Sequence, residues 1–562
     1  MYGNSRFSNA PSESSLGTTN EKVTTASAAP LAATTATVQQ YPYMWDTRDA
    51  DLDDPLHNPD PVRDAALDRS CAPFSSRGWI NASALFIICA GIITLFAGYP
   101  IIDHFIHEPP KTAGFNLGGI NGTGQVPALN NFRSLIDTDT PDSAKTRKGT
   151  DGKSYDLVFS DEFNTDGRSF YPGDDPFWEA VDLYYWPTVD LEWYDPRQIT
   201  TKNGKLVITM EEVLNHNLNF RSGMLQGWNK FCFTTGYIEV SVSMPGSPRA
   251  AGLWPAAWTM GNLGRAGYGA TTEGTWPYSY DSCDLGTFPN QTTANGQPAA
   301  ATTGGAGGAP LSFMPGQKLS ACTCPGSDHP GPSVGTGRGV PEIDIFETQI
   351  DTVRFQGEAS QSFQVAPYNY QYEFVNTSDV TPIYDSSVTR FNTYKGGVYQ
   401  QAISAVSDIN NENYAGNGYG TYGYEWWSNP NKREEGYIAW SVDGKQTWKI
   451  TADTVGADST AEISARIVPE EPMYIIFNLG MSPGFQKQDF TNLQFPTQML
   501  IDYIRVYQRE DVISEDSTSC NPSSRPTEEY INGHINAYTN PNFTTWDQAG
   551  YTFPRNSQYD GC

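Results

Sequence analysis

The chain has 562 residues, too many for one ordinary domain, and its 52 Gly and 39 Pro indicate the many turns of an all-β protein. The formal net charge of -28 repels polyanions and argues against nucleic acid as a partner. Aromatic residues make up 13% of the chain, a content that suits either a large core or surfaces that stack against sugar rings.

The N-terminal part predicts a tail followed by a membrane anchor. Residues 1–78 are rich in Ser, Thr, Ala, Asp and Pro, so we expect a disordered tail. Residues 79–102 carry no charge and are long enough to cross a bilayer, and a cleaved signal peptide would be shorter and nearer residue 1. The flanking charges are Arg63, Arg69 and Arg77 before the span and Asp103 and Glu108 after it. The positive-inside rule then predicts a single-pass type II membrane protein of the secretory pathway, with a cytosolic tail and a lumenal or extracellular remainder.

Cysteines and glycosylation sequons agree with this orientation. Residues 103–150 form a predicted linker, and six cysteines lie beyond the span, an even number that favours disulfides. The alternative for Cys322 and Cys324, a metal site, lacks a Cys/His cluster at zinc-like spacing. The six cysteines are Cys232, Cys283, Cys322, Cys324, Cys520 and Cys562, and the sequons begin at Asn121, Asn290, Asn376 and Asn542. The six His are scattered, so we expect neither a metal nor a cofactor.

Short β-like runs separated by Gly, Pro, Asn and Asp fill residues 151–510, and they predict a two-sheet antiparallel jelly-roll sandwich of the concanavalin A-like class. The clearest runs are 155–159, 206–209, 236–243, 253–258, 437–442, 446–450, 473–477 and 499–507. Asp443-Gly444 predicts a hairpin turn. An insert at 261–340, rich in Gly, Ala and Thr, is long enough to be either a cleft-covering lid or a disordered decoration. Residues 511–562 form a C-terminal extension that contains two of the cysteines.

The stretch Glu342-Ile-Asp-Ile-Phe-Glu347 carries three carboxylates interleaved with apolar residues. Strict alternation would send Glu347 to the face opposite Glu342 and Asp344. A β-bulge at Ile345-Phe346 would return it, which places the outer carboxylates about 13 Å apart between Cα atoms, at roughly 3.3 Å per strand step. Side chains that lean inward could then reach the separation of about 5 to 5.5 Å that a retaining glycosidase needs. The alternative, a solvated acidic edge, is disfavoured because the interleaved residues give the strand a core side.

This stretch resembles the bulged catalytic strand, E-x-D-x-x-E, of glycoside hydrolase family 16. Residues 158–163, 236–240, 252–258 and 501–507 are similar to other strands of that family, so the resemblance covers about residues 150 to 510. It implies that Glu342 is the nucleophile, Glu347 the general acid/base and Asp344 a helper to the pair. The tail, single span, insert and Cys-ended extension resemble, more narrowly, the fungal type II membrane proteins associated with cell-wall β-1,6-glucan synthesis.

We therefore expect a membrane-anchored retaining glycosidase or transglycosylase whose partner is a β-glucan, with cell-wall synthesis machinery as a further partner. Trp254 and Trp258 share one strand face and, together with one of Trp426 and Trp427, are candidates for sugar stacking. The alternative function is a non-catalytic glucan-binding or scaffolding protein that supports a glucan synthase.

Overall fold

The computed structural model describes residues 61–68, 76–99 and 134–562, and its contacts divide the chain into two units, residues 1–106 and 107–562. The first unit contains α2 (Pro61–Asp68), α3 (Ser76–Ile93) and the π-helical turn η1 (Thr94–Gly98). Most of the predicted tail, and residues 103–133 of the predicted linker, lie outside the described residues. Residues 61–68 differ from the expectation of a structureless tail, because they form α2.

Helix α3 and η1 contain the predicted membrane span. Residues Trp79–Gly98 are long and apolar enough to cross a membrane, with a mean hydropathy of 2.2. None of this stretch is buried, so its apolar side chains are exposed.

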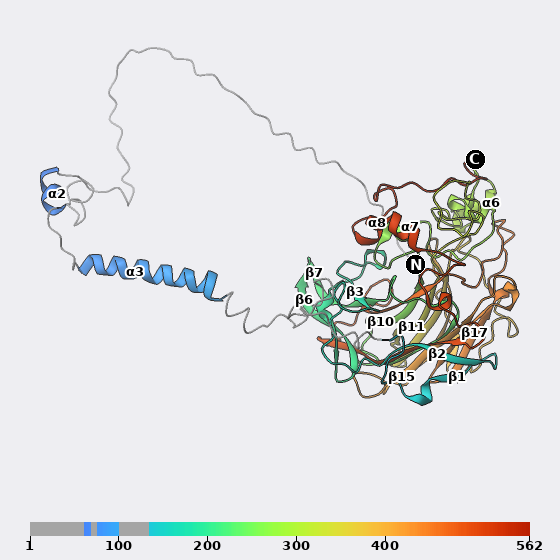
Figure 1. Cartoon of the computed structure of the whole chain (residues 1–562), viewed down its shortest axis with the longest axis horizontal. Helices are drawn as coiled ribbons and strands as arrows, with labels where there is room; N and C mark the ends of the chain where they lie inside the picture. The colour runs from blue at the N-terminus through green and yellow to red at the C-terminus, as the bar shows by residue number, and fades with distance from the viewer. Residues whose placement is uncertain (1–60, 69–75, 100–133) are drawn as a thin grey trace, which may run out of the picture. The chain divides into compact units, whose positions relative to one another are not determined.

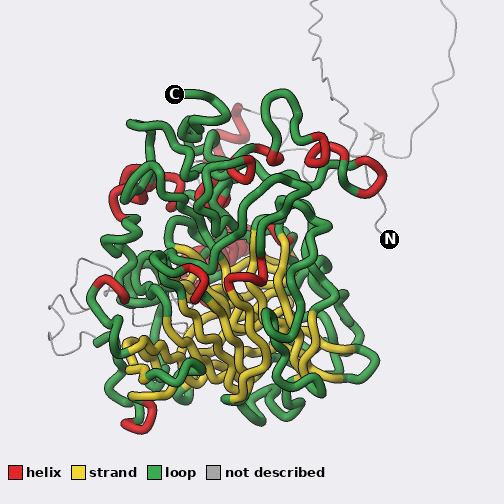
Figure 2. The backbone as a smooth tube through the Cα atoms, turned by 90° about the vertical axis from the view of Figure 1, so that its right-hand side faces the viewer, coloured by secondary structure: helices red, strands yellow, loops and turns green. Residues whose placement is uncertain are grey.

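The second unit contains a sandwich of two sheets, which confirms the predicted fold class (Figures 1 and 2). Sheet A consists, in order, of β17 (Lys445–Thr451), β16 (Tyr437–Val442), β15 (Gly420–Trp427), β9 (Gly236–Ser243), β19 (Thr497–Arg509), β6 (Lys205–Asn215), β7 (Leu218–Ser222) and β4 (Glu192–Tyr194), with β2 (Ser154–Asp161) beside β19, β1 (Thr146–Lys148) beside β2 and β5 (Ile199–Lys202) beside β6. Sheet B consists, in order, of β13 (Thr389–Phe391), β14 (Gln401–Asp408), β12 (Gln356–Val365), β11 (Glu342–Asp351), β10 (Trp254–Gly261), β18 (Met473–Gly480), β8 (Met224–Gln226) and β3 (Glu179–Ala180). All pairs are antiparallel except β4 with β7.

The main core fills the space between the sheets. Alternating residues of each strand point into it, such as Ile238 and Val240 of β9 and Ile343 of β11, all fully buried. Trp440 and Trp448 stack there with ring centroids 4.3 Å apart. Each such side chain stabilises the sandwich by about 1.5 to 3 kcal/mol through apolar burial. The polar residues of β11 lie on the opposite face of sheet B, which is called its outer face below.

The insert between β10 and β11 and the C-terminal extension pack together on one side of the strands, where Figure 2 shows loops and short helices gathered. The α-helices of these two segments are α5 (Gly269–Thr272), α6 (Ala299–Thr303), α7 (Glu528–Gly533) and α8 (Ile535–Thr539). The 3-10 turns of the second unit are η3 (Asp142–Ala144), η4 (Trp186–Thr188), η5 (Pro196–Gln198), η6 (Leu285–Thr287), η7 (Pro289–Gln291), η8 (Ala306–Gly308), η9 (Arg433–Glu435), η10 (Ala452–Val455) and η11 (Asp516–Thr518). The insert therefore has a defined structure and is not a disordered decoration.

All six predicted cysteines form disulfides, which excludes the metal-site interpretation of Cys322 and Cys324. The pairs are Cys232–Cys520, Cys283–Cys322 and Cys324–Cys562. Two of the three bonds join the extension to the rest of the unit, and the third closes a loop within the insert.

A buried ion pair anchors the end of the insert. Arg338 is fully buried, and its Nε and Nη2 atoms donate to the two carboxylate oxygens of Glu471 at 2.7 and 2.8 Å. Its Nη1 atom donates to the carbonyl oxygens of Gly331 and Pro526, so one guanidinium connects the insert, the segment before β18 and the extension. Such a pair is costly to break because the remaining charge stays buried.

Replacing Arg338 with Leu should therefore destabilise the protein by about 3 to 5 kcal/mol, since it leaves the Glu471 carboxylate unpaired. Urea unfolding of the full chain in detergent, followed by tryptophan fluorescence, measures the change. The double variant R338L/E471L serves as the control and should recover part of the loss, because it removes the stranded charge as well. A double variant no more stable than R338L would contradict this account.

Candidate active site

The predicted bulge is present in β11 and brings its three carboxylates to the outer face of sheet B. The pairs between β11 and β12 are Glu342–Gln364, Asp344–Ser362 and Glu347–Ser360. The register shifts between Asp344 and Glu347, which leaves Ile345 and Phe346 together opposite Gln361. Both bulge residues are fully buried in the core between the sheets. The extra residue thus restores Glu347 to the face of the other two carboxylates.

Each glutamate accepts a hydrogen bond from a tryptophan. Trp276 of the insert donates its indole Nε1–H to Oε2 of Glu342 at 2.7 Å. Trp254 of β10 donates in the same way to Oε1 of Glu347 at 2.9 Å. Both glutamates remain partly exposed, so one oxygen of each is held by the protein while the side chain stays accessible.

Asp344 lies between the two glutamates and is almost completely buried, at 1% exposure. Its Oδ2 atom accepts a hydrogen bond from Nε2 of Gln364 at 2.7 Å. Its carboxyl group also interacts with that of Glu342, which raises the pKa of Asp344 and lowers that of Glu342. Two adjacent carboxyl groups favour a state in which one of them is protonated.

Burial raises the pKa of all three carboxyl groups above their ordinary values. The charge of Glu347 adds to this increase at Glu342 and Asp344, whereas the indole donors oppose it at both glutamates. Burial, the charges of the two glutamates and the contact with Glu342 together raise the pKa of Asp344 well above its ordinary value. Asp344 is therefore a group that can stay protonated beside a Glu342 anion.

Trp254 and Trp258 both lie on the outer face beside the carboxylates. Trp254 is partly exposed and stacks on Phe485, with ring centroids 4.3 Å apart. Trp258 is buried, and its Nε1 atom donates to Oδ1 of Asn478 at 2.8 Å. Of this pair, only Trp254 presents surface that a sugar ring could contact.

The expectation that Trp426 or Trp427 faces sugar is wrong, because both belong to β15 in sheet A. Trp426 is fully buried in the core and donates to the carbonyl oxygen of Pro469. Trp427 points to the other side of sheet A, where the guanidinium of Arg509 lies 3.9 Å from its ring centroid. The alternation along the strand correctly placed the two rings on opposite faces, but it could not tell to which sheet the strand belongs.

Trp276, Gln364 and Tyr185 are site residues that the sequence reasoning missed. Trp276 reaches Glu342 from a separation of 66 positions in the sequence. The Tyr185 hydroxyl lies close enough to Glu342 for the carboxylate charge to raise the pKa of the tyrosine, together with its burial. The sequence feature that could have identified Trp276 as a site residue is a large aromatic side chain in an insert otherwise rich in Gly, Ala and Thr.

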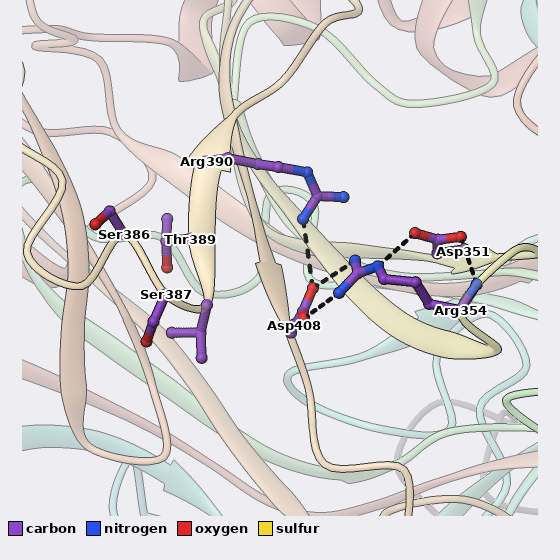
Figure 3. A pocket seen from close by; sticks show the side chains of 8 residues that line it. Asp351, Arg354, Ser386, Ser387, Thr389, Arg390 and Asp408 are labelled. Atoms are coloured by element: carbon purple, nitrogen blue, oxygen red, sulfur yellow. Dashed lines mark hydrogen bonds and ion pairs between the residues drawn. The ribbon is translucent and has the colours of Figure 1, made fainter.

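A separate cavity of about 280 Å³ lies at the end of β13 and β14, and Figure 3 shows its side chains. Arg354 contacts Asp351 and Asp408 there, and Arg390 contacts Asp408 as well. Buried Glu358 contacts both arginines. Because these two arginines and three carboxylates pair with one another, the cavity is a structural ion-pair network rather than part of the acidic site.

Comparison with known proteins relates the chain to a family of proteins associated with beta-glucan synthesis. The family model described as "Beta-glucan synthesis-associated protein SKN1/KRE6/Sbg1" matches residues 43–562. The chain is 44% identical over 534 residues to beta-glucan synthesis-associated protein KRE6 of Saccharomyces cerevisiae, covering 93% of this chain and 70% of the relative. It is 42% identical to SKN1 of the same yeast, covering 91% of this chain and 66% of that relative.

Among solved structures, the catalytic domain of an endo-1,3-beta-glucanase (laminarinase) from Thermotoga petrophila is similar over 64% of this chain and 99% of its own, with 20% identity and a TM-score of 0.36. This TM-score is too low to support an assignment of the fold, which comes instead from the sheet topology described above. The family match, residues 43–562, covers nearly the whole chain. The chain belongs to the SKN1/KRE6/Sbg1 family of beta-glucan synthesis-associated proteins.

Proposed function

We propose that this chain is a membrane-anchored, β-glucan-active retaining enzyme, a glycosidase or transglycosylase, that acts in the biosynthesis of fungal cell-wall β-1,6-glucan. The observation that carries the proposal is the bulged strand, which gathers three carboxyl groups on one face and gives each glutamate its own indole donor. Family membership supports β-glucan as the polymer.

In the proposed reaction, Glu347 protonates the glycosidic oxygen while the Glu342 carboxylate attacks the anomeric carbon and forms a glycosyl ester. The Glu347 carboxylate then takes a proton from an acceptor hydroxyl. The acceptor oxygen attacks the anomeric carbon and releases Glu342. Water as the acceptor gives hydrolysis, and a glucan hydroxyl gives transfer.

The surroundings of the two glutamates favour this division of roles. Glu342 receives hydrogen bonds from Trp276 and from protonated Asp344, and both stabilise its anion. Glu347 has one donor, Trp254. Burial raises the pKa of Glu342 to about 8 and that of Glu347 to about 7, so both can hold a proton near neutral pH, and the role of Glu342 as the anion depends on its donors.

We place residues 1–78 in the cytosol and the sandwich in the lumen or outside the cell, beside the machinery that makes wall glucan. The apolar stretch Trp79–Gly98 supports an anchor, and the three disulfides support an oxidising compartment. Three of the four sequon asparagines, Asn290, Asn376 and Asn542, are exposed and thus available for glycosylation. Asn121 lies outside the described residues.

The roles of the carboxylates can be tested by trapping with an activated 2-fluoro-glucoside, read by mass spectrometry of the peptide that contains residues 342–347. Glu342→Gln should abolish labelling, because an amide has no anionic oxygen to attack with. Glu347→Gln should still be labelled and should keep the label longer, since no base remains to activate the acceptor. Asp344→Asn should slow both steps without abolishing either one.

Label on Glu347 in the wild-type chain would reverse the two assignments. A folded chain that binds glucan but takes no label from any glucan-like probe would favour the non-catalytic scaffolding function.

The two indole donors predict separate effects on the pH profile of kcat/KM. Activity needs Glu342 ionised and Glu347 protonated. Burial raises the pKa of Glu342 to about 8 and that of Glu347 to about 7, so activity falls at low pH with the pKa of Glu347 and at high pH with that of Glu342. Trp276→Phe removes a donor to the Glu342 anion, raises its pKa and should move the alkaline limb upward by about one pH unit.

Trp254→Phe is the matched control and should move the acidic limb upward instead, because it raises the pKa of Glu347. If Trp276→Phe moved only the acidic limb, this assignment of the two limbs to Glu342 and Glu347 would be wrong.

The proposed topology predicts a chain with N-glycans on the sandwich. Treatment with an N-glycosidase should increase its gel mobility, and Gln substitutions at Asn290, Asn376 and Asn542 should reduce that shift stepwise. In sealed microsomes, added protease should remove the tail and leave residues 134–562 intact. If the tail were protected from protease and the glycosidase left the gel mobility of the sandwich unchanged, the orientation would have to be reversed.

A further inference from the structure

Loops form the surface beside the acidic strand on the side of β12. Every residue of β12 and β14 is buried except Gln356 and Asp408, which lie at the ends of these strands farthest from Glu342. A ligand at the acidic site therefore meets, on this side, the loops that border the two strands. The turn at residues 396–400, just before β14, is one of these loops, and it is hydrogen-bonded to the site.

A chain of side-chain hydrogen bonds connects this turn to the acidic strand. Gln364 of β12 donates from Nε2 to Oδ2 of Asp344 at 2.7 Å, and its Oε1 atom accepts a hydrogen bond from Nε2 of Gln400. Gln364 is buried, whereas Gln400 is partly exposed. Gln400 therefore marks the point where the surroundings of the carboxylates reach the surface of the turn.

Two glycines give the turn its shape. The backbone N–H of Gly397 donates to the carbonyl oxygen of Gln400 at 2.6 Å, which closes the turn. Gly396 has a φ of +84°, and a Cβ atom there would lie 2.1 Å from the same carbonyl oxygen. Only glycine fits this position without strain. The backbone thus fixes where residues 398–400 lie relative to the site.

Two exposed aromatic rings meet at this turn. Tyr399, next to Gln400, is 64% exposed. Phe313 of the insert is 43% exposed, and its ring centroid lies 6.0 Å from that of Tyr399. The backbone N–H of Phe313 donates to the carbonyl oxygen of Val398 at 3.0 Å, which holds the insert against the turn. The two rings, called the rim pair below, therefore come from separate segments and lie side by side at the surface.

The insert presents Phe313 outward from an otherwise buried stretch, since Leu311, Ser312 and Met314 are all buried. Contact between the two rings holds the insert and the turn together, but it does not account for the large exposed fraction of each. Exposed aromatic rings beside a polar site are typical of a surface that binds a ligand. Aromatic rings stack against the apolar faces of sugars, and rings already held in place lose little conformational freedom on binding.

We infer that the rim pair of Phe313 and Tyr399 binds a sugar of the β-glucan chain away from the bond that reacts, so that the insert favours long glucan chains over short ones. This inference rests on the proposed function. Two side chains, Gln364 and Gln400, separate the rim pair from the acidic strand, so the sugar on the rings is not the one that reacts. The rings then add affinity for chains long enough to reach them.

The test measures how affinity depends on chain length in the full-chain Glu347→Gln variant in detergent, because this variant removes turnover from the measurement. Calorimetry with linear β-1,3- and β-1,6-linked gluco-oligosaccharides of increasing length gives the dissociation constants. Adding Tyr399→Ala or Phe313→Ala should weaken the binding of the long oligosaccharides about fivefold or more, because a stacking contact is lost. The same variants should bind the shortest oligosaccharides as tightly as their parent does.

Two further variants separate stacking from a general disturbance of the surface. Tyr399→Phe keeps the ring and should keep the affinity of the parent at every length. Tyr384→Ala is the matched control, because Tyr384 is 50% exposed beside sheet A, where its backbone N–H donates to the carbonyl oxygen of Thr447 in β17. This control should bind every oligosaccharide as the parent does.

Unchanged affinity for the long oligosaccharides in both alanine variants would overturn the inference and leave the proposed function standing. Equal loss of affinity for short and long oligosaccharides would also overturn it, because the rings would then act on the reacting part of the site. A folded chain that binds glucan oligosaccharides of no length would overturn the inference and the proposed function together.

Discussion

Two residues of β11 lie opposite one residue of β12, and the chemistry of the outer face follows from this mismatch. Because Ile345 and Phe346 both enter the core, Glu347 returns to the side of Glu342 and Asp344. Three carboxyl groups so close together repel one another when ionised, and their burial increases that cost. The strand keeps this arrangement because its other face is fixed in the main core of the sandwich.

The cost of crowding the carboxylates is offset by donors from separate parts of the chain. Trp254 comes from the neighbouring strand, Gln364 from the next strand and Trp276 from the insert. A family 16-like strand alone would supply the acids, but the electrostatic state of Glu342 depends on a segment outside the sandwich. The insert is therefore part of the acidic site as well as part of the second apolar core, which it forms with the extension, β10 and β18.

The sequence predicted the strands with clear alternation, the bulge and the Asp443-Gly444 hairpin, because these depend on local patterns of side chains. It missed β12 and β14, whose Ser, Ala and Gln residues have weak strand preference. The pairing of the disulfides and the contact from Trp276 to Glu342 were beyond local reasoning, since they join distant segments. Trp426 shows the same limit, because its face could be predicted from alternation but its sheet could not.

The disulfides impose an order on the making of this protein. A chain synthesised from its N-terminus contains the three carboxylates long before Cys520 and Cys562 exist, and their partners Cys232 and Cys324 precede them by 288 and 238 residues. The apolar core that the insert and the extension form with β10 and β18 can be completed only after the extension has been synthesised. A nascent or truncated chain therefore carries the acids without all of their surroundings.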